Sequence, residues 1–444
     1  MRVLSDTSLR GRRYKKISEF REVEEVLAEV IPRIRVKPAV VTKRTRSAVG
    51  CILASNVYAR RDLPPLPMSH VDGFAARSID LRNASQDAPV GLLVEGSVGP
   101  GESGMEIGPG RVFRIHTGGY LPEGADTVIP QEDVFTDGSR IYVTRPYTPS
   151  ENVVPAGSDV RRGQLMAGKG EALSPAKASL LETLGVYEVS VCEGLRVSIL
   201  SFGDELTDNP AEAERGKILN THAVLVSEMA RALCCDIVRA QIVPDRPEAV
   251  VAAIEEGIET SHLVLTIGGS SVGDIDLVGA ELDRRSELFI QGLKLQPGRV
   301  GGIALIDGKP VVVLPGLIHS TVNVFNYLAA PVIAHMLETS LEQFIITVSA
   351  RMAEPVELRR WLDFKRIVWV TLKRIDGGGY EANPNVADAS NVSSIAHSHG
   401  FIEVPPNKPL ITRGDNVVVR IPLWITRGIV GWSRSFIYSS KQDP

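Results

Sequence analysis

The stretch SHLVLTIGGSSVGDID, residues 261–276, contains the features that decide the fold. It begins with an apolar run of strand length, and Gly268 and Gly269 follow that run directly. Glycines and serines at the end of a strand place backbone N–H groups and hydroxyls around a concave turn that suits phosphate or another oxyanion. Asp274 and Asp276 stand at the end of this turn. Anion donors beside carboxylates predict a phosphorylated ligand that is handled together with a divalent cation.

This turn also has a purely structural interpretation, in which glycine only supplies a permissive backbone between a strand and a helix. The two serines, the two aspartates and the surrounding strand–helix pattern favour the oxyanion interpretation. No Gly-Lys-Ser/Thr follows the glycines, and no G-x-G-x-x-G is present. The turn is therefore neither a P-loop nor a dinucleotide-binding fingerprint.

Strands and helices alternate on both sides of this stretch, between about residues 193 and 338. The expected strands are LRVSILS, DIVRAQIV, HLVLTI and KPVVVLP. Helical patterns lie between and after them. Such alternation predicts an α/β domain with a mostly parallel sheet covered by helices. Ligands of such sheets bind at the carboxyl ends of the strands, where GGSSVGD, FGDEL and LPGLIHS all fall.

The remaining chain adds β segments and short helices. Short strands with frequent glycines between residues 89 and 143 predict a small β domain, and a similar pattern after residue 338 predicts a second one. The pattern over residues 17–31 predicts an amphipathic helix, with Ser18 as its cap. Another short helix is expected from Ser174, which precedes a proline at the first helical position.

The bulk composition is that of a soluble globular protein with several domains. The chain has 444 residues, 43% hydrophobic and 23% charged, with a net charge of −4. This balance disfavours broad nucleic-acid binding and binding to an acidic membrane surface. No signal peptide and no apolar run of membrane-spanning length is present. Four scattered cysteines form no C-x-x-C pair, which argues against a disulfide framework and fits a reducing cytoplasm.

Several polar residues are candidates for chemistry, and each has a structural alternative. Glu205, after an expected strand, could bind a cation or belong to a solvated turn. Asp245 also suits the start of a helix as a capping residue. Arg299 follows a Pro-Gly turn and is either an anion ligand or a solvated arginine. Asp72 and Thr117 lie in sequences that are ordinary for turns. His397 and His399 form an H-x-H without a third ligand at useful spacing, so we assign them to a surface loop.

Motifs in order along the chain resemble those of the molybdopterin molybdenumtransferases, which are the MoeA-type proteins and the gephyrin E domain. PMSHVDGFAAR is similar to the S-x-M-D-G-[YF]-A motif of that family, and RIHTGGYLPEGADTVIPQEDV to its RIMTGAPVPxGADxVVxxED segment. AGSDVRRGQLMAGKGEALSPAKASLLETLGVYEVSV also resembles a family segment. LRVSILSFGDEL resembles RVAILSTGDEL, and GGSSVGDID resembles GGVSVGDYD. The similarity extends from about residue 16 to the C-terminus.

The resemblance implies a homodimer of elongated subunits with four domains. An elongated, discontinuous N-terminal domain is expected over residues 1–60 and 148–192, with a small β domain inserted at 61–147. A three-layer α/β domain, like the molybdopterin adenylyltransferases, is expected at 193–338, and a C-terminal β domain at 339–444. The active cleft is expected between the α/β domain of one subunit and the other domains of its partner.

The resemblance also implies a reaction. Adenylylated molybdopterin and molybdate are the expected substrates, AMP and molybdenum cofactor the products, and Mg²⁺ the assisting ion. Transfer of the substrate between enzymes suggests a molybdopterin adenylyltransferase as a protein partner. Matching positions assign catalysis and Mg²⁺ binding to Asp276, Asp245 and Glu205. The matching also assigns substrate binding to Gly268, Gly269, Ser270, Ser271, Gly273, Asp274, Pro297, Gly298, Arg299, Pro315, Gly316, Ser320, Asp72, Thr117 and Asp159.

The chain departs from the family pattern at the expected anion site. The family's PGNPVS reads PGLIHS at residues 315–320, and KPGKP reads QPGRV at 296–300. Loss of one cation there is expected to weaken oxyanion binding by about 1–3 kcal/mol. Three functions therefore remain open: a molybdate inserter with an altered pocket, a tungstate-preferring inserter, or a paralogue that binds molybdopterin as a scaffold. The retained carboxylates favour an enzyme. Arg299 and Ser320 around one anion would support insertion, whereas Ile318 or His319 in that space would oppose it.

Overall fold

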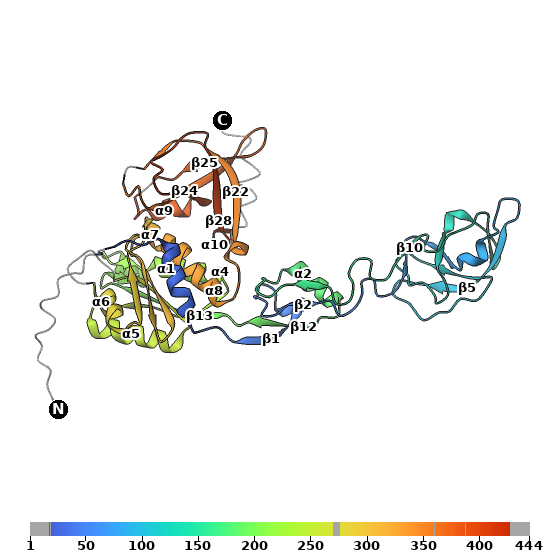
Figure 1. The fold of residues 1–444 in the computed structure, drawn as a ribbon, viewed down its shortest axis with the longest axis horizontal. Coiled ribbons are helices and arrows are strands. Elements are labelled where there is room, and N and C mark those ends of the chain that lie inside the picture. The colour runs from blue at the N-terminus through green and yellow to red at the C-terminus, as the bar shows by residue number, and fades with distance from the viewer. Residues whose placement is uncertain (1–16, 18, 270–275, 359, 387, 427–444) are drawn as a thin grey trace, which may run out of the picture.

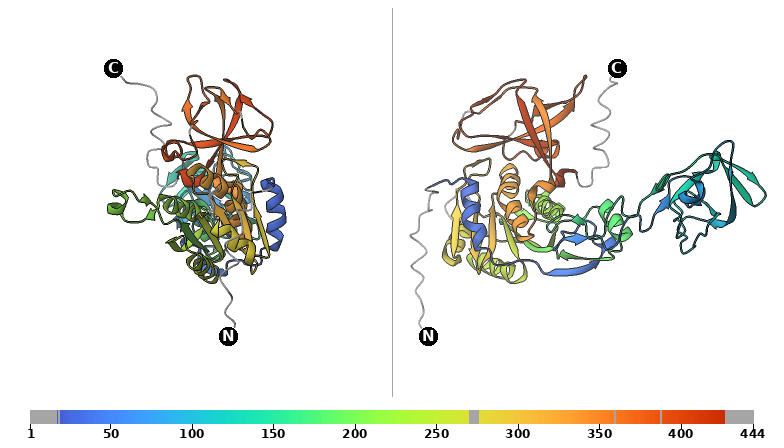
Figure 2. Two further views of the ribbon diagram at one scale, coloured as in Figure 1. Left: turned by 90° about the vertical axis from the view of Figure 1, so that its left-hand side faces the viewer. Right: turned by 45° about the vertical axis from the view of Figure 1, so that its right-hand side comes forward.

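The protein is strongly elongated, with its globular part at one end (Figure 1). The computed structural model describes residues 17, 19–269, 276–358, 360–386 and 388–426. An α/β domain and the C-terminal sheet form the globular part, and a narrow arm connects them to a small β domain at the far end. The right-hand view of Figure 2 also shows that the arm extends away from the α/β domain and does not fold back onto it. No described helix is long and apolar enough to span a bilayer.

A six-stranded sheet forms the centre of the α/β domain, and its first four strands are parallel. The strand order is β16 (Cys235–Val243), β13 (Leu195–Phe202), β17 (Leu263–Gly268), β21 (Lys309–Leu314), β20 (Gly302–Ile306) and β18 (Leu288–Gln291). β20 is antiparallel to both of its neighbours. β17 and β21 are buried along almost their whole length, because a parallel sheet is covered on both faces.

Two hydrophobic cores cover the two faces of this sheet. One core contains side chains of the helices α1 (Val23–Val30), α4 (Thr221–Ala232), α7 (Ile318–Val324) and α8 (Ala330–Met336). The other contains side chains of α5 (Pro247–Thr260) and α6 (Leu277–Arg285). This arrangement of helices, sheet and helices confirms the predicted three-layer α/β domain.

The arm is built from two segments of the chain that are far apart in sequence. β1 (Val40–Arg44) pairs with β12 (Glu188–Cys192), and β2 (Val57–Tyr58) pairs with β11 (Leu165–Ala167). α2 (Pro175–Thr183) packs on the same core, and Ser174 caps it by accepting a hydrogen bond from the Lys177 N–H, as predicted. The chain between the two segments forms the distant β domain.

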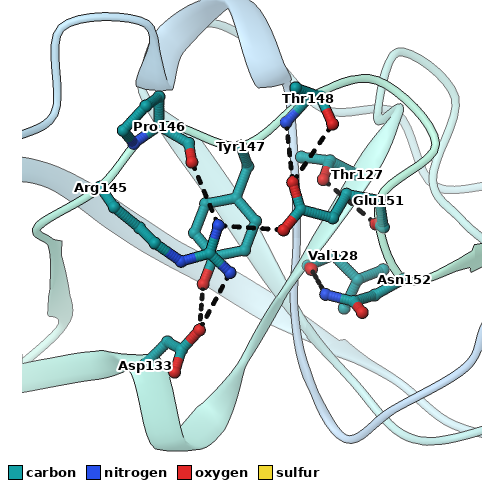
Figure 3. A network of polar contacts seen from close by, with 9 residues as sticks. All are labelled: Thr127, Val128, Asp133, Arg145, Pro146, Tyr147, Thr148, Glu151 and Asn152. Atoms are coloured by element: carbon teal, nitrogen blue, oxygen red, sulfur yellow. Dashed lines mark hydrogen bonds and ion pairs between the residues drawn. The ribbon is translucent and has the colours of Figure 1, made fainter.

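The distant domain is a six-stranded sheet, and a polar network fastens one side of it (Figure 3). Its strand order is β7 (Thr127–Pro130), β4 (Gly73–Ala76), β6 (Arg111–Ile115), β5 (Val90–Val98), β9 (Arg140–Val143) and β8 (Val134–Asp137). The Arg145 guanidinium lies over the Tyr147 ring and donates hydrogen bonds to Asp133 at 3.2 Å and to Glu151 at 2.9 Å. The Tyr147 hydroxyl donates to Asp133 at 2.6 Å. The network therefore ties the segment after β9 to the residues after β7.

The C-terminal domain is a third six-stranded sheet, and it takes its first strand from the preceding domain. The strand order is β19 (Leu295–Gln296), β24 (Lys365–Arg374), β25 (Tyr380–Pro384), β22 (Ile345–Met352), β28 (Asn416–Pro422) and β26 (Gly400–Val404). The four longer strands expected from the sequence are present. β19 precedes β20 of the α/β sheet and pairs with β24, so the two domains share a continuous piece of backbone.

An ion-pair cluster joins the arm to the α/β domain. Lys37, at the start of the arm, and Lys169, after β11, both pair with the Glu338 carboxylate, just after α8. The two ammonium groups lower the pKa of Glu338 to about 2. A folded-state pKa below the unfolded value means that this contribution to stability is present above pH 4.5 and is lost as the pH falls toward 2.

Beside this cluster, the backbones of the arm and the α/β domain are in close contact, so the junction leaves no room for a larger side chain. The Gly170 carbonyl accepts hydrogen bonds from Thr339 Oγ1 at 2.6 Å and from Gln343 Nε2 at 2.9 Å. The Ala172 N–H donates to Gln343 Oε1 at 2.8 Å. Gly170 has φ +82°, and a Cβ there would overlap the Glu338 carbonyl oxygen. The backbones of the two domains are therefore packed against each other at this glycine.

Gly170→Ala is expected to destabilise the protein by about 2–4 kcal/mol, because it combines left-handed strain with a steric overlap. Gly163→Ala is the matched control, since Gly163 has φ +84° but open space around it. That control is expected to cost only about 1 kcal/mol. Thermal unfolding measures both, and hydrogen exchange of residues 168–172 and 338–343 locates the effect. Equal losses in the two variants would contradict the packing argument.

Two predictions about helix starts are wrong. The first helix starts at Val23, not near residue 17, because Arg21 forms backbone hydrogen bonds with Gly292 and Lys294 and is held extended. Ser18, its predicted cap, lies outside the described residues. Asp245 does not cap α5: the capping position is Arg246, without a side-chain cap.

Candidate active site

The carboxyl ends of the four parallel strands meet at one edge of the α/β sheet. β13 ends beside the ends of β16 and β17, since Phe202 pairs with both Val243 and Gly268. β21 ends beside β17, where Ile267 pairs with Leu314. The loops with Glu205, Asp245, the glycine turn and Pro315-Gly316 therefore lie side by side at this edge, which is called the crevice here because parallel sheets bind their ligands at such an edge.

Three carboxylates of two neighbouring loops gather at one end of this edge. The Asp245 N–H donates to the Asp204 carboxylate at 3.3 Å. Partial desolvation, together with the negative charges of Glu205 and Asp204, raises the pKa of Asp245. Gly203 has φ +153°, and a Cβ there would lie 2.6 Å from the Glu205 carboxylate oxygens. The negative charges of the two loops thus act on each other and disfavour ionisation of Asp245.

Asp276 lies on the far side of the glycine turn. Its carboxylate caps α6 by accepting from the Gly279 N–H at 2.7 Å, and Gln291 Nε2 donates to it at 3.3 Å. Burial raises the pKa of Asp276, against the effect of these two hydrogen bonds. Among the described residues, no group of three or more His, Cys, Asp or Glu side chains is arranged to hold a metal ion. Asp276, Asp245 and Glu205 are thus not brought together as one ready-made metal site.

The glycines of the turn are positions of close backbone approach. Gly268 and Gly269 have φ of +75° and +68°, and a Cβ at Gly269 would lie 3.0 Å from Phe202 Cβ. A Cβ at Gly316 would be 3.7 Å from the Gly268 Cα, so the turn after β21 lies against the turn after β17. The predicted ligands Ser270, Ser271, Gly273 and Asp274 lie outside the described residues.

In the altered PGLIHS segment, Ile318 and His319 are directed into the protein. Ile318 is 3% exposed and packs in the hydrophobic core. His319 is directed to the C-terminal domain, where its Nε2 lies 2.6 Å from Ser394 Oγ and 3.2 Å from the Asn391 carbonyl. Burial lowers the pKa of His319, which favours the neutral ring. Ser320 follows in the first turn of α7 and is 8% exposed.

The altered QPGRV segment lies at the junction with the C-terminal sheet. The Arg299 guanidinium carbon is 4.6 Å from the centre of the Trp361 ring. A residue of α7 fixes the Pro297-Gly298 turn: Asn323 Nδ2 donates a hydrogen bond to the Pro297 carbonyl at 2.9 Å. Gln296 Oε1 is buried and has no hydrogen-bond partner in the described part of the chain. The neutral amide that replaces the family's lysine is therefore turned into the protein.

The predicted residues of the distant domain form a small site of their own. The Thr117 N–H and hydroxyl donate to the Asp72 carboxylate at 2.7 and 3.0 Å. These hydrogen bonds, the backbone one first, lower the pKa of Asp72. His116 Nδ1 lies 3.9 Å from the same carboxylate. Asp159 is exposed in the arm, where its N–H donates to Leu63. Within one chain the arm keeps the small β domain, to which Asp72 and Thr117 belong, far from the α/β domain (Figure 1).

Three contributors to the site carry no clear signal in the sequence. Lys217 donates to the Asp204 backbone carbonyl and brings a cation to the acidic loops. Gln291, at the end of β18, bonds Asp276, and Trp361 contacts Arg299 from another domain. Each contact joins segments that are 13 to 62 positions apart, so only the fold reveals it.

Three family models match successive parts of the chain. The MoeA N-terminal region (domain I and II) matches residues 20–185. A probable molybdopterin binding domain matches residues 198–335, and the MoeA C-terminal region (domain IV) matches residues 351–421.

Curated relatives and a solved structure agree with these models. The chain is 26% identical over 386 residues to a molybdopterin molybdenumtransferase of Staphylococcus aureus (strain COL), covering 86% of this chain and 91% of the relative. It is 30% identical over 294 residues to that of Haemophilus influenzae, covering 66% of this chain and 71% of the relative. The crystal structure of a molybdopterin biosynthesis MoeA protein from Pyrococcus horikoshii is similar, with a TM-score of 0.80 and 28% identity. The alignment covers 91% of this chain and 99% of that chain.

The fold and these matches define a protein of molybdenum cofactor biosynthesis that contains a molybdopterin-binding domain. The chain belongs to the MoeA-type molybdopterin molybdenumtransferase family and is an enzyme of the transferase class. The resemblance inferred from the motifs and the fold class inferred from the strand–helix pattern are both confirmed.

Proposed function

We propose that this enzyme inserts molybdate into adenylylated molybdopterin and releases AMP with the help of Mg²⁺. The observation that carries this proposal is the meeting of acidic loops and two glycine turns at the carboxyl edge of one parallel sheet. The glycine turns let the backbone approach a phosphate closely. The acidic loops supply oxygen ligands, which are those that Mg²⁺ takes in proteins.

The arrangement of the carboxylates suits Mg²⁺ better than it suits a metal ion whose ligands all come from the protein. Mg²⁺ is usually bound through one or two carboxylates and completed by water and substrate phosphate oxygens. The pair Glu205 and Asp245, with Asp276 across the turn, suits such a shared site, and it agrees with the lack of a three-ligand cluster among the described residues. When bound, Mg²⁺ offsets the negative charge of the phosphoanhydride whose P–O bond must break.

The protein groups would orient the substrate rather than attack it. The turn backbone and α6, which Asp276 caps, would face the phosphates. Asp276 has a raised pKa, and a bound cation would draw it into its ionised form. No protein nucleophile is needed, because an oxygen of water or of the oxyanion can attack the phosphorus and form the new P–O bond while the phosphoanhydride bond breaks and AMP leaves.

We further propose that the working enzyme is a homodimer. Asp72 and Thr117 are predicted substrate ligands, but they belong to the small β domain, which the arm holds away from the α/β domain of the same chain (Figure 2). A second copy in a symmetric dimer would bring one chain's distant domain to the other's crevice. A molybdopterin adenylyltransferase remains the proposed supplier of the substrate.

The direct test is AMP release from adenylylated molybdopterin. Purified enzyme is incubated with this substrate, Mg²⁺ and either molybdate or tungstate, and AMP is quantified against a reaction without enzyme. Release that requires both Mg²⁺ and an oxyanion supports the proposal, and the ratio of the two initial rates gives the metal preference. Tight binding of the substrate without AMP release would instead identify a binding or scaffold protein.

A further inference from the structure

Arg299 is held by an aromatic ring instead of a carboxylate. Its guanidinium carbon lies 4.6 Å from the centre of the Trp361 ring. Among the described residues, no carboxylate lies within ion-pair distance of Arg299, whereas several other arginines of the globular part have such a partner. The positive charge is therefore positioned, and no described carboxylate neutralises it.

Trp361 is itself fixed by contacts from two directions. Its ring packs edge-on against Phe20, with centroids 5.9 Å apart, and lies 5.0 Å from the Phe364 ring. The Phe364 N–H donates to the Trp361 carbonyl at 3.1 Å, and Trp361 has φ +55°. A side chain held in this way loses little further freedom when it supports another group.

Arg299 lies at the same edge of the sheet as the PGLIHS segment. It precedes β20, whose first residue, Gly302, pairs with Val313 near the carboxyl end of β21. The turn before Arg299 is held by Asn323 of α7. Ser320 lies three residues before Asn323 and so shares its helix face. These positions place the Arg299 turn beside the first turn of α7.

Stacking occupies the face of a guanidinium and leaves its N–H groups free in the plane. We propose that Trp361 is a positioning residue, which holds Arg299 so that its N–H edge receives a tetrahedral oxyanion, molybdate or tungstate. This inference rests on the proposed insertion reaction. The family has lysines at the positions of Gln296 and Arg299. In this chain the pair of Arg299 and Trp361 would bind the oxyanion in their place. A lysine needs no such support, because its ammonium group is a point charge.

The test measures oxyanion binding in the full-length protein, separately from AMP release. Molybdate and tungstate are titrated by calorimetry, and tryptophan fluorescence reports whether the ring beside Arg299 senses the ion. Trp361→Leu is expected to weaken binding about 5- to 10-fold, since a partly desolvated cation–π contact has about this strength. Trp361→Phe keeps an aromatic face and is expected to stay within about threefold of wild type. Trp424→Phe, a change at a ring that does not touch Arg299, is the matched control.

A double-mutant cycle separates positioning from a general structural role. In an Arg299→Ala background, Trp361→Leu should cause no further loss of oxyanion affinity. In turnover assays, Trp361→Leu should raise the KM for molybdate and leave the KM for adenylylated molybdopterin unchanged. Equal oxyanion affinity in wild type and Trp361→Leu would overturn this inference and leave the proposed function intact. If wild type bound no oxyanion and released no AMP, both would fail.

Discussion

Asp276→Asn is expected to reduce AMP release by about 100-fold or more, because a carboxylate that faces a cation and phosphates acts mainly through its charge. Asparagine has nearly the same shape and is as good a helix cap as aspartate. The hydrogen bond from the Gly279 N–H can therefore persist while the charge is lost. The second oxygen, which accepts from Gln291 Nε2, becomes an NH2 group, and the Gln291 amide must turn its oxygen toward it to keep a hydrogen bond. Initial rates of AMP release at saturating Mg²⁺ measure the effect.

The same substitution is expected to leave stability at pH 7 unchanged or higher. The pKa of Asp276 is raised in the folded protein, so its ionisation costs folding free energy as the pH rises above about 3.8, the unfolded value. The Asp276→Asn variant does not have this cost. Its gain in stability over wild type should therefore disappear below about pH 3.8. Asp283→Asn, at an exposed position of the same helix, is the control for both measurements. A fall in activity that matched a fall in stability would assign Asp276 a structural role only.

The order of strands and helices was predictable from the sequence, because parallel strands covered on both faces appear as near-continuous apolar runs. LRVSILSF and HLVLTI are examples. The first helix was predicted too long because its amphipathic period continues upstream, where Arg21 instead forms backbone hydrogen bonds with Gly292 and Lys294. The capping pattern at Asp245 failed because its N–H is used by Asp204, in a contact that exists only after two strands have paired.

The candidate site was only partly predictable, for a similar physical reason. Motifs locate the loops at the carboxyl edge, since a loop after a strand keeps its place in any sheet order. They do not show which loops touch. Asp72 and Thr117 are 45 positions apart, yet they share two hydrogen bonds across the small β domain. Arg299 was predicted as an anion ligand, a role that stays a prediction, but its support by Trp361 depends on the packing of two domains.

Two inactive variants are expected to restore each other's activity when they share a dimer. Asp72→Asn removes the charge from the distant domain, and Asp276→Asn removes it from the crevice. In a heterodimer of these chains, one crevice combines both changes, and the other combines an intact crevice with an intact distant domain. The heterodimers are isolated with two different affinity tags. They should regain about half of the wild-type AMP release, because one of the two symmetric sites is complete.

The matched control is a heterodimer of an Asp276→Asn chain and an Asp245→Asn chain. Both residues belong to the α/β domain. Each crevice of that heterodimer then carries one change, and no recovery is expected, whichever distant domain reaches it. The comparison cancels effects of tagging and co-expression. Recovery in the first pair alone requires that residues of two chains meet in one site. Equal recovery in both pairs, or full activity of a monomer, would place a complete site within a single chain, and the arm would then have to serve another purpose.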